Sequence, residues 1–405
     1  MSGGSGKKRM LAWIRLAGIL LVFLILAGGG YFISQAIAAK QELADLILAG
    51  AGSSSVAAYT FDETGELVED DGTVFIHADE PRIMASTMKI VVLAAYADAI
   101  ANGDIAPQET VRVADWESYY LPMSDGNAHL IGLKSLGMAS DELGFARDQA
   151  AQITLDDLAR LMTHYSENAA TDYLIQRLGT ERMTSILEKA GIENHTPVGM
   201  TLGVALAALD HENPSFSPQA LQDLAAASPD EQAAAFDRLV QLYTTDPKWR
   251  AAQIDFMISL KENAESLDPE ALLNNQVLAV QFFPQGTARE YAQLMAKTAS
   301  GRLISVEVSG IMQEMLESVP GDWPLDLLFY ERFGAKDGIA PGVLTMASYA
   351  LPSRGRMAGQ SRVVVVLANQ LPLESWMRQV QFQGHYLLGL DLARAARVFA
   401  QFSGN

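Results

Sequence analysis

The amino-acid sequence predicts an α+β fold in which strands from both ends of the chain form one antiparallel sheet. Two stretches that alternate between apolar and polar residues lie near the N-terminal end, at 53–61 and 72–78. Two more, at 342–352 and 361–370, lie near the C-terminal end and flank a hairpin-like turn. Most of the chain between them has helical periodicity. These observations predict a sheet packed against a group of helices from the middle of the chain.

Residues 1–39 predict a basic tail followed by a membrane-spanning segment. Residues 16–39 contain no charged side chain, which is enough to cross a hydrocarbon core of about 30 Å. Lysines and arginines precede this stretch, so the rest of the chain is expected outside the cytoplasm, on a single-pass anchor in the cell membrane. The alternative is a cleaved signal peptide with a cleavage site at 36–38, which would give a secreted protein. We favour the anchor because the apolar stretch exceeds the usual signal core.

The composition excludes several kinds of site and partner. The chain has no cysteine, which rules out disulfides, cysteine metal sites and a cysteine nucleophile. The histidines lack the spacing of metal ligands, so we expect neither a metal nor another cofactor. The net charge is −19, and such a surface repels nucleic acid and anionic lipid. No pattern indicates an oligomeric state.

The helices are predicted from apolar periodicity and from the signals that end a helix. A helix at 40–50 is expected to end at Gly50, and the apolar run at 88–100 is followed by an Asn-Gly stop. Residues 153–178 predict two helices with a break near Ser166.

Residues 212–283 differ in character from the rest of the predicted domain, which spans 40–405. They are rich in Ala, Asp and Gln with helical periodicity, so they predict a helical insertion that covers a cleft or binds a partner. After it, residues 286–301 predict one helix, and residues 385–402 predict a last amphipathic helix.

Three short motifs follow one another along the chain: STMK at 86–89, SEN at 166–168 and KDG at 336–338. Each has an ordinary structural alternative. The serine of the first motif could be a helix N-cap beside a solvated lysine, the second could be a capping turn, and the lysine of the third could be a surface charge. Their setting favours a site. The first opens a helix after two strands, the second lies in a break between helices, and the third precedes a strand hairpin.

In this order, the motifs resemble the S-x-x-K, S-D-N and K-T-G elements of the penicillin-recognising serine hydrolases, the class A β-lactamases and low-molecular-mass D,D-peptidases. The likeness covers about 53–200 and 285–402. It implies a β-lactamase/transpeptidase-like fold and an extracytoplasmic serine acyl-hydrolase. Such an enzyme would acylate Ser86 with a β-lactam or a related amide, from a small-molecule or peptidoglycan-type substrate, and then hydrolyse the acyl-enzyme.

Two alternatives to this function stay open. One is a D,D-peptidase-like or esterase activity with slow deacylation. The other is a non-catalytic, membrane-anchored binding or scaffold protein that works through its helical insertion.

The chemistry gives each motif residue an expected role. A serine hydroxyl needs a neighbour to take its proton, and Ser86 and Lys89 share a helix face at i and i+3. Burial and the nearby cation of Lys336 would both favour the neutral form of Lys89 as general base. Ser166 is expected to relay a proton to the leaving nitrogen, and Asn168 to position Lys89 and a substrate amide.

The first and third motifs also predict which groups contact the substrate. The Ser86 N–H, at a helix N-terminus, is one expected oxyanion donor, and the resemblance implies the Ile339 N–H as the other. Asp337 and Gly338 are expected to line the substrate site. In the family, the middle residue of K-T-G is a hydroxyl that helps to hold the substrate carboxylate. Asp337 would repel that carboxylate unless it is protonated or turned away.

Deacylation needs a second base. Class A enzymes carry a glutamate in an E-x-x-L-N element that activates water, and the EALLN sequence at 270–274 matches this pattern. The same residues also predict an ordinary helix start, with Pro269 at its first position and Glu270 in its first turn. If they are only a helix start, the acyl-enzyme is expected to turn over slowly.

Overall fold

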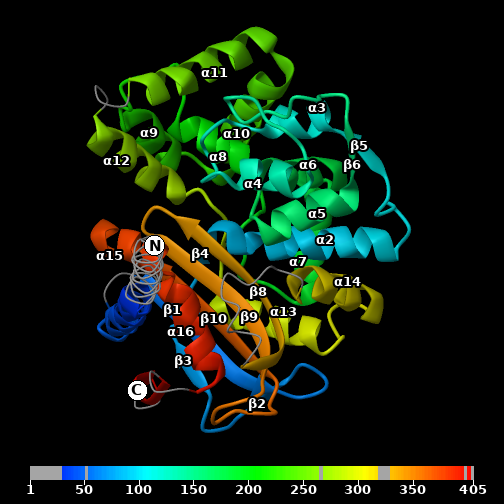
Figure 1. The fold of residues 1–405 in the computed structure, drawn as a ribbon, viewed down its shortest axis with the longest axis vertical. Helices are drawn as coiled ribbons and strands as arrows, with labels where there is room; N and C mark the ends of the chain where they lie inside the picture. The colour runs from blue at the N-terminus through cyan, green and yellow to red at the C-terminus, as the bar shows by residue number, and fades with distance from the viewer. Residues whose placement is uncertain (1–29, 51–52, 264–267, 318–328, 396–398, 403–405) are drawn as a thin grey trace, which may run out of the picture.

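The computed structural model describes residues 30–50, 53–263, 268–317, 329–395 and 399–402. Strands from both ends of the chain form its main, six-stranded antiparallel sheet, in the order β2-β1-β10-β9-β8 with β3 also paired to β1 (Figure 1). These strands are β1 (Ser53–Phe61), β2 (Leu67–Val68), β3 (Val74–Ile76), β8 (Tyr330–Ala340), β9 (Val343–Pro352) and β10 (Arg362–Asn369). The predicted α+β fold is confirmed.

The centre of the sheet joins the two ends of the chain. Strand β1 pairs with β10 from Ser53 opposite Asn369 to Thr60 opposite Arg362. Every residue of β10 is buried, because helices cover both faces of the sheet and a strand buried on both faces is apolar throughout. This explains the run of valines at 363–366, which does not alternate with polar residues.

Helices pack on both faces of the sheet. One face is covered by α2 (Lys89–Ala101), α13 (Ala288–Ala299) and α14 (Val306–Glu317), which share the largest hydrophobic core with it. The other face is covered by α16 (Gly384–Ala393) and by a helix of residues 30–48, which buries Leu43, Ala44 and Ile47 (Figure 1). The STMK motif runs into α2 on the first of these two faces.

The predicted membrane segment lies mostly outside the described residues. Of residues 16–39, only 30–39 are described, and they continue the helix predicted for 40–50 toward the N-terminus. There, Ala36 and Ala39 are buried against Phe382 of α15 (Leu373–Phe382). No helix in the described ranges is long and apolar enough to cross a membrane.

The helix ends that carry the site follow local sequence signals. The predicted pair of helices at 153–178 is confirmed as α5 (Leu155–His164) and α6 (Asn168–Leu178). Helix α2 ends at Asn102, as predicted. The other small elements are β4 (Arg82–Ile83), η1 (Ala85–Met88), β5 (Thr110–Arg112), α3 (Val113–Trp116), η2 (Glu117–Tyr119), α4 (Ala128–Ser135), β6 (Gln152–Thr154), α7 (Thr180–Ala190) and β7 (Gln285–Gly286).

The described parts of residues 201–283, which we call the helical lobe, lie beside α4 and α6 at the upper end of the view in Figure 1. The lobe contains α8 (Thr201–Ala208), α9 (Gln219–Ala226), α10 (Pro229–Thr245), α11 (Pro247–Glu262) and α12 (Pro269–Val280). Its hydrophobic core also includes Leu121 from outside the lobe, and two hydrogen bonds to main-chain carbonyls hold it to the rest of the protein as well. Tyr243 Oη donates to the carbonyl of Tyr120 at 2.5 Å, and the Arg250 guanidinium donates to the carbonyl of Glu117 at 2.8 Å.

The C-terminal part of the fold differs from the prediction in two places. The KDG motif precedes the β9–β10 hairpin as predicted, but it also lies inside a further strand, β8, an edge strand whose glycines and charged residues are poor β formers. The predicted last helix at 385–402 is too long, because α16 ends at Ala393 and only the short α17 (Phe399–Phe402) follows in the described residues.

Thr345 of β9 should be important for stability, because it joins the sheet to η1. Its buried hydroxyl donates to the Met84 carbonyl at 2.9 Å and lies 2.7 Å from Thr87 Oγ1. Thr345→Val keeps the shape but leaves the buried Thr87 hydroxyl without this partner and removes one of the two hydrogen bonds to the Met84 carbonyl, so the free energy of unfolding should fall by about 1–3 kcal/mol. Urea unfolding followed by circular dichroism measures the loss. In the control Thr298→Val, only a bond to the carbonyl one turn back in α13 is lost, so an equal or larger loss there would contradict the prediction.

Candidate active site

Ser86 lies in η1, which runs directly into α2. The preceding Ala85 has a φ of +43°, a left-handed conformation that costs a non-glycine residue about 1–3 kcal/mol and is often held at functional sites. Ser86 is partly exposed, whereas its neighbours Ala85 and Thr87 are buried. Neither η1 nor α2 has a side-chain N-cap, so the interpretation of Ser86 as a capping residue is wrong.

Lys89 is only 1% exposed, so the alternative of a solvated lysine is wrong. Its Nζ donates to the Ser166 carbonyl at 2.5 Å and to Asn168 Oδ1 at 2.7 Å, and lies 3.3 Å from Ser166 Oγ. Among the described residues, Ser86 Oγ makes no hydrogen bond. The structure therefore brings Lys89, Ser166 and Asn168 together, one helical turn from an unengaged serine hydroxyl.

The surroundings of Lys89 favour its neutral form. Burial, and after it the ammonium of Lys336, lower the pKa of Lys89 from 10.5 to about 7. The carboxylates of Glu167, Asp172 and Asp125 act in the opposite direction. A lysine whose pKa is near 7 is neutral in a large fraction of molecules at neutral pH, so it can accept a proton.

The break between α5 and α6 presents the SEN motif to Lys89. Ser166 has a φ of +61°, which turns the chain sharply before α6. Glu167 is the N-cap of α6, and its carboxylate accepts from the Ala169 N–H at 2.9 Å and from the Ala170 N–H. The interpretation of Ser166 and Asn168 as the capping residues is therefore wrong, and both contact the lysine instead.

The KDG motif lies on β8 beside η1. Lys336 is 4% exposed, so its interpretation as a surface charge is wrong. A Cβ on Gly338 would lie 2.7 Å from the Ser86 backbone nitrogen, so only glycine lets the strand approach the serine this closely. Ile339, the residue of the second predicted oxyanion donor, follows Gly338 on this edge strand.

Asp337 is turned toward the opposite face of the sheet. It pairs across the strands with Met346, and directly opposed residues share a face, here the one covered by Gly389 of α16. Asp337 Oδ1 lies 3.3 Å from Lys336 Nζ, and Oδ2 lies 3.9 Å from His385 Nε2. Burial acts to raise the pKa of Asp337, but Lys336 and His385 outweigh it and hold the pKa well below its usual range. Asp337 was expected to be either protonated or turned away from the substrate. Its carboxylate is turned away, and it is ionised.

Glu270 lies in an ordinary helix start. Asp268 caps α12, Pro269 occupies the first turn, and Glu270 is exposed in the helical lobe, as the helix-start alternative predicts. No group of three or more histidines, aspartates and glutamates in the described residues is placed to hold a metal ion.

Sequence reasoning missed Asp172, the acid on α6 one turn after Asn168. Asp172 is fully buried, and its carboxylate accepts from the N–H groups of Thr201 and Leu202, each at 2.7 Å. Burial raises the pKa of Asp172 to about 7, although these donors and Lys89 act against the increase. The i, i+4 spacing from Asn168 was the available signal, because it places both residues on one helix face.

The sequence also matches a known family. Residues 38–264 match the Beta-lactamase2 family, described as a beta-lactamase enzyme family. This match covers more than half of the 405 residues, so the chain belongs to that family. No curated protein matches the chain.

The chain is also similar to several solved structures. A β-lactamase from Sphaerobacter thermophilus is 18% identical, with a TM-score of 0.50, over 92% of this chain and 97% of that chain. A β-lactamase from Chitinophaga pinensis is 11% identical, with a TM-score of 0.48, over 90% and 98%. The penicillin-binding protein PBP-A is 14% identical, with a TM-score of 0.47, over 86% and 95%. The first of these likenesses shows that the chain has the β-lactamase fold.

Asp172 should make stability depend on pH. Its pKa is raised from 3.8 to about 7 in the folded state, so its contribution to stability is full below pH 3.8 and is lost as the pH rises through about 7. Asp172→Asn is neutral throughout, so its stability relative to wild type should increase between pH 4 and pH 7. Urea unfolding across this range measures the difference.

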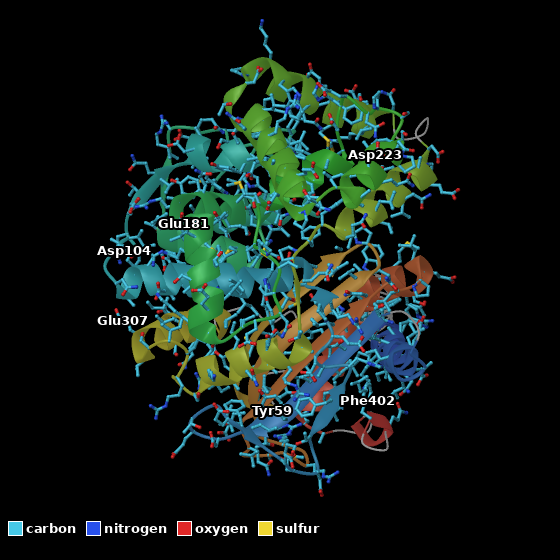
Figure 2. All side chains as sticks on the ribbon, turned by 180° about the vertical axis from the view of Figure 1, so that it is seen from behind. Tyr59, Asp104, Glu181, Asp223, Glu307 and Phe402 are labelled. Atoms are coloured by element: carbon cyan, nitrogen blue, oxygen red, sulfur yellow. The ribbon has the colours of Figure 1, made fainter. Side chains whose placement is uncertain are left out.

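The control for this measurement is Asp223→Asn, which changes an exposed aspartate on α9 of the helical lobe (Figure 2). It should keep the pH dependence of wild type. Equal slopes for the two variants would contradict the role given to Asp172.

Proposed function

We propose that this protein is an extracytoplasmic, membrane-anchored serine acyl-hydrolase whose Ser86 is acylated by a β-lactam or a related amide. The observation that carries the proposal is the buried Lys89, with a pKa near 7, one turn from the partly exposed Ser86. The family and fold support the same class of reaction. The proposed location rests on the uncharged residues 16–39 and the basic residues before them.

In the acylation step, neutral Lys89 takes the proton of Ser86 Oγ, and the oxygen attacks the carbonyl carbon of the substrate. The Ser86 and Ile339 N–H groups stabilise the negative charge that develops on the carbonyl oxygen. The bond from the carbonyl carbon to nitrogen then breaks, and Ser166 passes a proton from Lys89 to the leaving nitrogen. The contact between Lys89 and Ser166 Oγ, at 3.3 Å, supports this relay.

Deacylation is slow in this proposal, because neither the predicted base Glu270 nor the two acids of the α6 segment, Glu167 and Asp172, is free to activate a water. Glu270 is exposed in the helical lobe. Of the acids closer to Lys89, Glu167 accepts hydrogen bonds from the α6 N-terminus, and Asp172 accepts them from the α8 N-terminus. Because both oxygens of each carboxylate already accept hydrogen bonds from main-chain N–H groups, we expect neither to accept a proton from an attacking water.

Asp337 weakens the attraction for a substrate carboxylate. Its charge lies 3.3 Å from Lys336 Nζ and offsets the cation that would otherwise attract the anion. Neutral amides and esters lose less binding free energy from the pairing of Asp337 with Lys336 than carboxylated β-lactams do. We therefore place amides and esters without an essential carboxylate within the substrate class.

The acylation proposal is tested by intact-mass spectrometry of the ectodomain with a fluorescent penicillin. Wild type should carry a lasting adduct, Ser86→Ala should carry none, and Lys89→Met should react at least about 100-fold more slowly. Because only neutral Lys89 can act as a base, the rate should rise with pH with a half-point near 7. An adduct that persists in Ser86→Ala would place the nucleophile elsewhere.

Asp337→Thr should speed acylation by a carboxylated penicillin about tenfold. The change removes a charge 3.3 Å from Lys336 Nζ, and tenfold corresponds to about 1.4 kcal/mol. The second-order acylation rate is the measurement, and Asp337→Asn, which removes the same charge, should increase it similarly. Rates equal to wild type in both variants would show that Asp337 does not affect the substrate.

A further inference from the structure

A buried cluster of two glutamates and one histidine lies behind the SEN motif. His129 of α4 lies between Glu117 of η2 and Glu167 of the SEN motif: Nε2 is 3.1 Å from Glu117 Oε1, and Nδ1 is 3.1 Å from Glu167 Oε1. All three side chains are at most 1% exposed. A carboxylate accepts hydrogen bonds and does not donate them, so both ring nitrogens must carry a proton and the ring is an imidazolium.

The remaining oxygens of the cluster also have donors. Glu167 accepts from Trp116 Nε1 at 3.1 Å in addition to the α6 N–H groups. Glu117 accepts from the Ala146 N–H at 2.7 Å and from Gln149 Nε2 at 2.5 Å. Buried ionic groups hold a unique geometry when every member is satisfied in this way.

The cluster is connected to Lys89 through the backbone of the motif. Glu167 is the residue between Ser166 and Asn168, which both accept hydrogen bonds from Lys89 Nζ. Anchoring of the Glu167 side chain therefore fixes the positions of its two neighbours. Glu167 also acts on Lys89 directly, since its negative charge raises the pKa of that lysine.

We propose that His129 is a positioning residue of the active site. As an imidazolium, it holds Glu167 so that Ser166 and Asn168 enclose Lys89. Its positive charge also offsets part of the negative electrostatic potential that the two glutamates produce at Lys89. The proposal rests on the proposed function, because it assigns Lys89 the role of the base.

The charges around His129 support this state. Burial acts to lower the pKa of His129, but Glu117 and Glu167 outweigh it and raise the pKa to about 9. The other groups that face the ring are the carboxylate of Asp125, which precedes α4, and the ring of Tyr120, stacked at 3.8 Å between centroids. With the imidazolium, the three titrating side chains of the cluster carry one net negative charge, and without it they carry two.

The variant His129→Gln keeps a donor in the cluster but removes the charge. Glu167 keeps its three N–H donors and stays ionised, so the lost cation should raise the pKa of Lys89. In the pH profile of Ser86 acylation, the half-point should move from about 7 to higher pH by about half a unit or more. The rate below the half-point should fall about threefold or more and recover at high pH.

The matched control is His211→Gln in the helical lobe, where the ring pairs with Gln253 and lies outside the cluster. It should leave the half-point at that of wild type. If His129→Gln lowers the acylation rate equally at every pH, or lowers only the stability, His129 has a structural role alone and the proposal is overturned.

Nuclear magnetic resonance of the His129 ring gives a readout that does not depend on activity. Both ring nitrogens should be protonated at pH 7 and titrate near pH 9, and Glu117→Gln should move the titration toward the ordinary value of 6.5. A neutral ring at pH 7 would overturn the proposal, whether or not His129→Gln folds. If wild type is not acylated at any pH, the proposed function fails, and the ring titration still decides whether His129 is an imidazolium.

Discussion

The burial of the Lys89 ammonium is the constraint on which the rest of the site depends. Removing such a group from water costs several kcal/mol unless acceptors replace the water. Here they come from one short break in the helices, which supplies the Ser166 carbonyl and the Asn168 amide oxygen. The strained backbone at Ala85 and at Ser166 belongs to the same arrangement, because both turns bring polar groups into an otherwise apolar core.

The site can form only when the whole domain is folded, because its three motifs come from distant parts of the chain. Strand β8 is held beside η1 through β9 and β10, and the pairing of β10 with β1 joins the two ends of the chain. Two polar residues of the sheet then attach the start of η1. Thr345 bonds to the Met84 carbonyl, and Asn369 accepts from the Ile83 N–H at 2.7 Å. The position of the nucleophile is thus set by long-range contacts and not by a local helix signal.

The sequence predicted whatever depends on short-range patterns. The apolar strands, the helix break and the order of the motifs were visible, and Pro269 correctly indicated a helix start at Glu270. Strand β8 could not be predicted, because its glycines and charged residues have low strand propensity. Gly338 is there because it lets the strand lie close to η1. Asp172 and His129 were missed for a different reason. Their burial depends on tertiary neighbours from η2 and α8, which no local pattern reveals.

The helical lobe is attached to the segment next to the site by bonds to main-chain atoms. Tyr243 and Arg250 donate to the carbonyls of Tyr120 and Glu117, and a carbonyl is present whatever the side chain. Docking of the lobe at these two points therefore depends on the path of the chain and not on the identity of the residues there. A partly exposed side chain between them, such as that of Ser118, can change during evolution while these two anchoring bonds are kept.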